Sequence, residues 1–363
     1  GYGALDAADT ENDNLAIGHD ALGGSIDGGE FNLAIGNYVL DANTSGDYNV
    51  ALGNQAMSAN TTGGSNLAIG HVALGSNTSG NYNVGVGHSG LNGNTTGLRN
   101  TALGYGALDY PDTENDNLAI GYDALGGPIA GGEYNVAIGN YSLDANTSGD
   151  NNIAIGGLAL TSNTAGNNNL AIGLNALRDN TTGGNNTATG NSALQSNTDG
   201  SYNTAYGHYA LANNSGAQNS GFGSAVLYSN TTGSDNMGFG YNALYTNTSG
   251  TRNIAMGYAA LNGPDTENDN LAIGYRALGG TIAGGEYNVS IGNYSMDALT
   301  SGDGNTGIGY NAMTALTTGS GNVSLGRASG TTITTGSNNT VIGKGADVSA
   351  SGAENQVVIG QGA

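Results

Sequence analysis

The acidic run Asp112-Thr113-Glu114-Asn115-Asp116 holds the residues most capable of chemistry in this sequence, and it occurs in three copies. Alternating carboxylates could collect Ca²⁺, a hard cation that takes oxygen ligands. The spacing only faintly resembles an EF-hand loop, because the turn Gly and the closing Glu are missing. A solvated acidic loop is the alternative, and it predicts no cofactor. The candidate calcium ligands are Asp9, Glu11, Asp13, Asp112, Glu114, Asp116, Asp265, Glu267 and Asp269.

The same carboxylates could be interpreted as the acid and base of a glycoside hydrolase, which needs two carboxyl groups beside the scissile bond. Three near-identical copies fit a repeated structural unit better than a single active cleft. No Cys or Lys nucleophile stands out either. We therefore expect a protein that is not an enzyme and has no catalytic residue. A polysaccharide-degrading tailspike is the less favoured alternative.

Histidine and tyrosine recur at fixed places. His19, His71, His88 and His208 each directly follow a repeated glycine, a place that Tyr and Asn also occupy. This favours a column of polar residues over a metal site. The 20 Tyr residues, against three Phe, could stack on sugars or contact neighbouring fibres, or they could stack on one another.

Threonine forms a third column, which begins Thr44, Thr61, Thr78, Thr95. It is similar to the threonine arrays of ice-binding solenoids, so an ice- or glycan-binding solenoid is an alternative function. The column lies in a predicted loop and is interrupted, for example at Asp112 and Ile129. Asn-Thr-Ser/Thr is also a glycosylation acceptor, although a turn explains the motif without sugar.

All these residues belong to one repeat, exemplified by Asn117-Leu118-Ala119-Ile120-Gly121. Counting between the repeated glycines gives 21 intervals, of which 17 are 17 residues, three are 18 and one is 16. A fixed short period is typical of a solenoid, whose coils contact mainly their neighbours. The sequence therefore predicts an all-β parallel β-solenoid of about 21 coils.

Each coil is numbered so that this anchor glycine is position five. Asn at position one is followed by a large, a small and a large residue, and this alternation predicts a short strand. We expect the large side chains at positions two and four to point inward and the small one at position three to point outward. The constant Leu or Met at position nine predicts a second short strand, with the glycine at a bend between the two.

The rest of the coil reads N-T-[ST]-G and predicts a turn. Length changes fall only in this turn, as expected for a loop. The repeated Asn side chains should form ladders that hydrogen-bond between coils. The structural residues of the repeat are Asn117, Ala119, Ile120, Gly121 and Leu125 and their equivalents.

At about 4.8 Å per coil, the solenoid would be a rod on the order of 100 Å long. Three inward side chains per coil offset only part of the conformational entropy lost on folding. A column of Ala, Gly and Ser at position three would let another chain approach closely. We therefore expect self-association, most simply about a threefold axis.

The chain divides into a regular solenoid over residues 1–325 and divergent coils over 326–363. The regular part carries a duplicated two-coil cassette at residues 4–47, 107–150 and 260–303. In the terminal part the ninth-position Leu gives way to Gly330 and Asp347, and Val341 and Val358 replace the small residue. This segment is predicted to be a cap or the approach to a missing domain.

A net charge of −22, with only six Lys and Arg, argues against nucleic acid and against anionic membranes as partners. No apolar run is long enough for a transmembrane helix, and no signal peptide opens the chain. The chain starts in mid-repeat, so we expect a piece of something longer. The absence of Cys fits an extracellular protein.

The pattern N-[TLV]-A-I-G-x-x-A-L-x-x-N-T-[ST]-G resembles the YadA-type head repeats of trimeric autotransporter adhesins. It resembles still more closely the 17-residue variant in bacterial surface proteins and phage tail-fibre-like proteins. The resemblance covers nearly all of the chain. It implies a left-handed parallel β-roll, a homotrimer, and a role in cell adhesion or as an extracellular filament. The autotransporter repeat is shorter, and no coiled-coil stalk or membrane anchor is present in this sequence.

We therefore expect a non-enzymatic structural rod of an extracellular filament, cell-surface appendage or phage tail fibre. Its expected partners are further copies of itself, including end-to-end contacts, and a surface glycan or host receptor.

Overall fold

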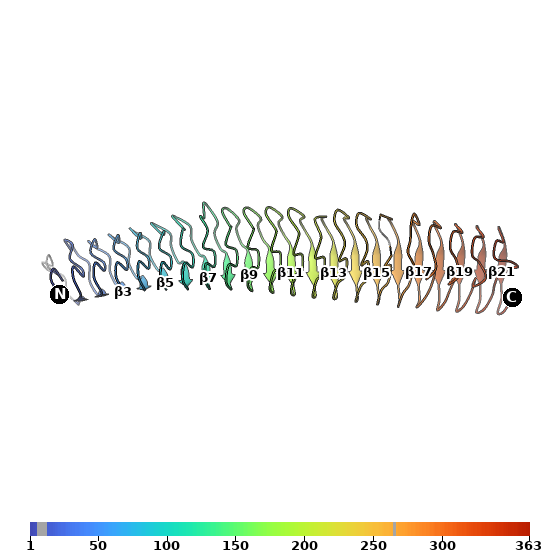
Figure 1. Ribbon diagram of the computed structural model, residues 1–363, viewed down its shortest axis with the longest axis horizontal. Helices are drawn as coiled ribbons and strands as arrows, with labels where there is room; N and C mark the ends of the chain where they lie inside the picture. Colours follow the sequence, from blue (N-terminus) through green and yellow to red (C-terminus); the bar gives the residue numbers. More distant parts are fainter. Residues whose placement is uncertain (6–12, 264–265) are drawn as a thin grey trace. The chain divides into compact units, whose positions relative to one another are not determined.

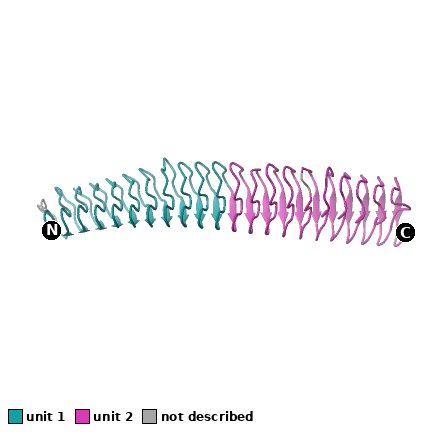
Figure 2. Ribbon diagram, in the orientation of Figure 1, with its two compact units in different colours: residues 1–185 teal, residues 186–363 magenta. Residues whose placement is uncertain are grey.

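The computed structural model describes residues 1–5, 13–263 and 266–363, and forms two compact units, Gly1–Asn185 and Asn186–Ala363 (Figure 2). Each unit is a parallel β-solenoid in which one three-residue strand recurs about every 17 residues (Figure 1). The described residues contain strands, turns and bends but no helix. The predicted fold class is therefore confirmed within each unit.

Unit 1 contains the strands β1 (Leu15–Ile17), β2 (Leu33–Ile35), β3 (Val50–Leu52), β4 (Leu67–Ile69), β5 (Val84–Val86), β6 (Thr101–Leu103), β7 (Leu118–Ile120), β8 (Val136–Ile138), β9 (Ile153–Ile155) and β10 (Leu170–Ile172). Unit 2 contains β11 (Thr187–Thr189), β12 (Thr204–Tyr206), β13 (Ser220–Phe222), β14 (Met237–Phe239), β15 (Ile254–Met256), β16 (Leu271–Ile273), β17 (Val289–Ile291), β18 (Thr306–Ile308), β19 (Val323–Leu325), β20 (Thr340–Ile342) and β21 (Val357–Ile359).

The register between coils follows the sequence repeat. Ala119 of β7 pairs with Ala137 of β8, although 18 residues separate them, so the extra residue lies in the loop. Across the one short interval, Ala205 of β12 pairs with Gly221 of β13. Each coil position thus stacks on the same position of the next coil, and the predicted insertion sites are confirmed.

The strand faces are the reverse of our expectation. Ala119 at position three is fully buried, whereas Leu118 and Ile120 are only half-buried. The interior is filled by small residues at positions three and eight and by Leu125 at position nine. In the regular coils this interior holds one large side chain, at position nine, and the large residues of the strand point outward.

Differences in sequence between coils of unit 2 support the conclusion that position three faces the interior. Val226 is larger than the Ala that is usual at position eight, and the neighbouring position-three residues are Gly221 and Gly238. A Cβ at Gly238 would lie 2.3 Å from Val226 Cγ2, so glycine there makes room for the valine. Position three therefore faces the core.

The predicted second strand does not form in any described coil. Residues at positions seven and nine have positive φ, for example 46° at Asp123 and 50° at Leu125, so the chain turns where the pattern predicted extension. Hydrogen bonds to the next coil persist, because Leu125 N donates to Ser142 O at 2.9 Å.

The anchor glycine bends the chain as predicted. At Gly156 φ is 132°, and a Cβ would lie 2.6 Å from Gly173 O of the next coil. An L-amino acid side chain is disfavoured there by both conformation and space.

Two buried columns of Asn confirm the predicted ladders. At position one, Asn66 Nδ2 donates to Gly80 O at 2.8 Å and to Asn49 Oδ1 at 3.2 Å. At position twelve, Asn60 Nδ2 donates to Gly63 O at 2.9 Å and to Asn43 Oδ1 at 2.8 Å. The amides close each turn and also join it to its neighbour.

The terminal strands β20 and β21 keep the same register. The packing inside the coils already changes before them: Leu299, Leu316 and Ile333, in the coils of β17, β18 and β19, replace Asn at position twelve and are fully buried. Ile333 Cδ1 lies within 3.3 Å of a Cβ built on Gly330, so it fills space left by the missing leucine. That this segment caps the solenoid or leads to a further domain stays a prediction.

Candidate functional site

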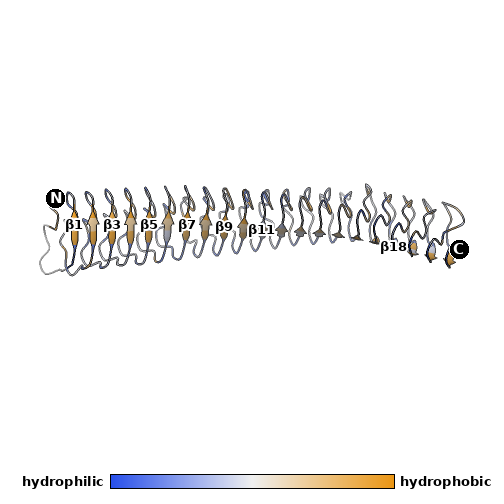
Figure 3. Cartoon of the chain, turned by 90° about the horizontal axis from the view of Figure 1, so that it is seen from below, coloured by the Kyte–Doolittle hydropathy of each residue, from blue (hydrophilic) through white to orange (hydrophobic). Residues whose placement is uncertain are grey.

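The outer strand face, which we define as the first and third residues of each strand, is the most extensive candidate surface in each unit. The large apolar side chains here are half-exposed; Ile155 and Phe239, for instance, are 37% and 48% exposed. In Figure 3 the strands β1 to β9 of unit 1 are coloured orange, as hydrophobic, whereas most connecting loops are pale or blue. The most exposed members are Leu15, Ile17, Ile69, Leu103, Ile153, Ile155 and Ile172 in unit 1, and Tyr206, Met237, Phe239, Ile254, Met256, Val323, Leu325, Val357 and Ile359 in unit 2.

The outer strand face carries no charge. Two positions in each of 21 strands give 42 side chains, and every one is apolar, Tyr, Thr or Ser. The chain as a whole has a net charge of −22. Contiguous apolar surface of this kind marks an interaction site in soluble proteins. The alternation of large and small residues indicates this surface in the sequence, but the sequence predicts the opposite face as the outer one.

The acidic run does not bring its carboxylates together in the described copies. Glu114 is buried, and its carboxylate accepts hydrogen bonds from Asp112 N at 2.8 Å and Gly131 N at 2.9 Å. Asp116 lies on the surface and accepts from Arg99 Nε at 2.6 Å and Nη2 at 2.7 Å. Asp112 accepts a hydrogen bond from the Thr95 hydroxyl. The three carboxylates therefore bond to three different protein groups.

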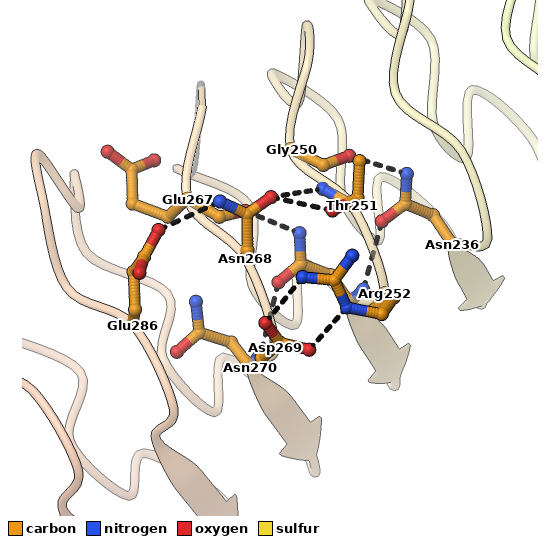
Figure 4. A network of polar contacts seen from close by, with 10 residues as sticks. Asn236, Gly250, Thr251, Arg252, Glu267, Asn268, Asp269, Asn270 and Glu286 are labelled. Carbon is orange, nitrogen blue, oxygen red and sulfur yellow. Dashed lines mark hydrogen bonds and ion pairs between the residues drawn. The ribbon is translucent and has the colours of Figure 1, made fainter.

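The third cassette repeats this arrangement (Figure 4). Glu267 Oε1 accepts from Gly284 N at 2.7 Å, and Asp269 is bonded to Arg252 at 2.7 and 2.8 Å. Asn268 joins coils, since it accepts from Thr251 N and donates to Glu286. The candidate ligands Asp9, Glu11 and Asp265 lie outside the described residues, whereas Asp13 is described and exposed. No group of three metal-ligating side chains occurs among the described residues.

Buried Glu114 lies where the position-twelve ladder of Asn side chains is interrupted. Pro111 and Pro128 stand at position twelve of successive coils, where the ladder Asn is missing. Glu114 stands at position fifteen in place of Gly, and its carbonyl accepts Asn100 Nδ2 at 2.7 Å. Its side chain accepts a hydrogen bond from Gly131 N, at the position where Gly149 N in a regular coil donates to the ladder residue Asn146.

A second group of carboxylates was missed by sequence reasoning. Burial raises the pKa of Asp109 and of Asp144, and the negative charge of Asp123 raises both pKa values further. Burial likewise raises the pKa of Asp41. The third cassette has Arg276 where the others have Asp20 and Asp123, and Arg276 Nε lies 3.4 Å from Asp297 Oδ1.

The aromatic residues form stacked columns along the solenoid. His71, His88, Tyr105 and Tyr122 follow one another with ring centroids 5.0 to 5.2 Å apart. In unit 2, Tyr258 and Tyr275 are 4.9 Å apart with their planes 7° from parallel. Inner members of a column thus use both ring faces within the chain and present mainly their edges to solvent.

The threonine column is engaged in hydrogen bonds between coils. Thr61 Oγ1 donates to Thr78 O at 2.9 Å, and Thr78 Oγ1 donates to Thr95 O at 3.0 Å. Each acceptor Asn of the glycosylation motif is in the position-twelve ladder. Asn60, for example, is fully buried and uses Nδ2 in two hydrogen bonds, so a glycan at that atom would break the ladder.

Neither the protein-family models nor the curated proteins gave a match to this chain. Over the described residues, no helix has the length and apolar character needed to cross a membrane.

Proposed function

We propose that this chain is a non-enzymatic structural segment of an extracellular fibre, built from three parallel copies that meet through their outer strand faces. It would serve a bacterial adhesin, a cell-surface appendage or a phage tail fibre. The observation that carries the proposal is the uncharged apolar outer strand face on each unit.

Packing within the single chain motivates the association. Each regular coil buries one large apolar side chain, such as Leu125 or Leu160, among Ala and Asn residues. Covering the outer strand face adds two further large side chains per coil, at about 25 cal/mol for each Å² of apolar surface removed from water. A sister chain is the simplest cover, since identical repeats present the same spacing at every coil.

A trimer and a left-handed turn are the choices that the resemblance to adhesin head repeats favours. Three chains around one axis close a ring, and closure leaves no unpaired outer strand face. We propose that association through this face leaves the acidic run of each cassette and the aromatic columns uncovered. Those columns, with hydroxyl and ring edges exposed, are where we propose contact with a surface glycan or host receptor.

Sedimentation equilibrium of the whole chain tests the proposal. We expect a mass of three chains for the native sequence. The double variant Ile155→Asp/Ile172→Asp should sediment as one chain, because it places charges on the outer strand face. Tyr110→Asp, which adds a charge at an exposed residue away from that face, is the matched control. A native chain that stays single at every concentration would refute the proposal.

A further inference from the structure

One short stretch of the outer strand face differs from the rest. On β12, β13 and β14 the third strand residue is aromatic, namely Tyr206, Phe222 and Phe239. Their rings stack, with centroids 5.5 Å apart for Tyr206 and Phe222 and 4.8 Å apart for Phe222 and Phe239. We call these three residues the aromatic band.

Among the strands that the structure describes, the aromatic band is the only aromatic part of the outer strand face, because every other third strand residue is Ile, Leu, Val, Met or Thr. Tyr206 is 42% exposed and Phe239 is 48% exposed. Met237 and Met256, at 44% and 40%, add further bulk beside it. Since stacking covers the ring faces within the chain, the ring edges project outward.

Elsewhere the outer strand face repeats itself. The three cassettes present Leu15 and Ile17, Leu118 and Ile120, and Leu271 and Ile273 at equivalent places. A neighbouring chain shifted by whole coils would therefore meet nearly the same aliphatic surface. When the side-chain pattern does not specify the register between two strands, the strands are prone to slip.

We propose that the aromatic band sets the alignment of associating copies, by packing against the aromatic band of a second copy of this chain. The inference rests on the proposed self-association and adds to it the residues that fix the register. A second copy is the occupant that fits, because an uncharged face avoids the repulsion expected between two chains of charge −22.

The difference in size between aromatic and aliphatic side chains would select the alignment of the chains. In aligned chains, aromatic edges meet aromatic edges and the wider side chains face each other at one height. In chains shifted by one or more coils, a Phe ring meets Ile or Leu on the partner while a matching gap opens elsewhere. Such overpacking and voids typically cost about 1–3 kcal/mol per site, enough to select one alignment among similar ones.

Disulfide trapping in the full chain tests the inference, since the sequence contains no Cys. A single Thr306→Cys substitution on β18 should form interchain disulfides when chains are aligned, because equivalent residues then lie at the same height. A shift of two coils moves these residues about 10 Å apart, beyond disulfide reach. The disulfide yield therefore reports the fraction of chains that are aligned to within about one coil.

The comparison uses two triple variants carrying Thr306→Cys. The band variant is Tyr206→Ile/Phe222→Ile/Phe239→Ile, and the control is Ile138→Leu/Ile155→Leu/Ile172→Leu on β8, β9 and β10. We expect both to keep the native mass by sedimentation and the native circular dichroism. The disulfide yield should fall severalfold in the band variant only.

An unchanged yield in an associated band variant would overturn the register inference and leave the self-association intact. A band variant that becomes a single chain while the control stays associated would also overturn it, because the band would then supply affinity and not alignment. A native chain that never associates would overturn the proposed function itself.

Discussion

At the scale of the residue, side-chain size decides which way each part of the coil faces. Ala119 and Leu125 are fully buried, while Ile120, a larger residue than Ala, is left half-exposed. Alternation shows that positions two and four share a face and that position three has the other, but it does not show which face is inside. Placing the larger residues in the core, as in a globular protein, is wrong here, because the small position-three residues and Leu125 fill the interior.

The ladder amides supply a prediction at this scale. Asn66→Ala removes donors to Gly80 O and Asn49 Oδ1 and the acceptor for Asn83 N, all of them buried. Leaving buried polar groups without partners should lower the free energy of unfolding by about 1–3 kcal/mol. Urea unfolding of the variant and of the native chain measures this difference. Asn54→Ala, at an exposed Asn with one long contact, is the control and should change little.

Acid should at first stabilise the fold. Burial raises the pKa values of Asp109, Asp123 and Asp144 above the ordinary 3.8. A raised folded-state pKa means that the folded chain holds protons the unfolded chain releases, so stability falls as pH rises through the folded-state pKa. The melting temperature should therefore rise as pH is lowered from 7 toward the ordinary Asp value.

The opposite change follows at lower pH. The Arg99 and Arg252 guanidinium groups lower the pKa values of Asp116 and Asp269, so their contribution is lost only when these carboxylates gain protons below pH 3.8. Asp123→Asn should weaken the rise by removing one repelling charge beside Asp109 and Asp144. A pH profile identical to that of the native chain would contradict the role given to these carboxylates.

Calcium gives a prediction about ligand removal. Glu114 is already bonded to backbone N–H groups and Asp116 to Arg99. We therefore expect a chelator to leave the melting temperature unchanged in a chain purified with Ca²⁺ present. A drop of several degrees on adding chelator, reversed by Ca²⁺, would show that the acidic run binds the cation after all.

At the level of the element, one strand and the turns that follow it make a coil, and the sequence predicts the position of the strand well. The 17-residue period, the strand at positions two to four, the glycine bend and the Asn ladders are all confirmed. The strand expected around position nine was wrong, because Leu125 and its equivalents take positive φ. The residue types do not predict this conformation, because a Leu with positive φ is uncommon in proteins.

The glycine bend can be tested with two adjacent residues. Gly156 has φ 132°, and a Cβ there would lie 2.6 Å from backbone atoms of Gly173. At Gly157 a Cβ would meet only Leu174 Cδ1, at 3.4 Å. We expect Gly156→Ala to cost several kcal/mol of stability, because both strain and backbone contact oppose it. Gly157→Ala should cost less than about 1 kcal/mol in the same unfolding experiment.

For the whole molecule, the proposed role depends on what covers the outer strand face. The sequence led us to expect self-association through the small residues at position three. Those residues are inside, so the proposed contact moves to the large apolar residues at positions two and four. The threefold number and the handedness come from resemblance and stay predictions.

Thiol labelling tests this most directly. Ile155→Cys places a thiol on the outer strand face, and Tyr110→Cys places one at an exposed residue away from it. If sister chains cover the face, a charged maleimide should label Ile155→Cys many times more slowly than Tyr110→Cys, and the rates should become similar when dilution separates the chains. If the two variants are labelled at equal rates even at the highest protein concentration, the outer strand face is uncovered, and the proposed association is contradicted.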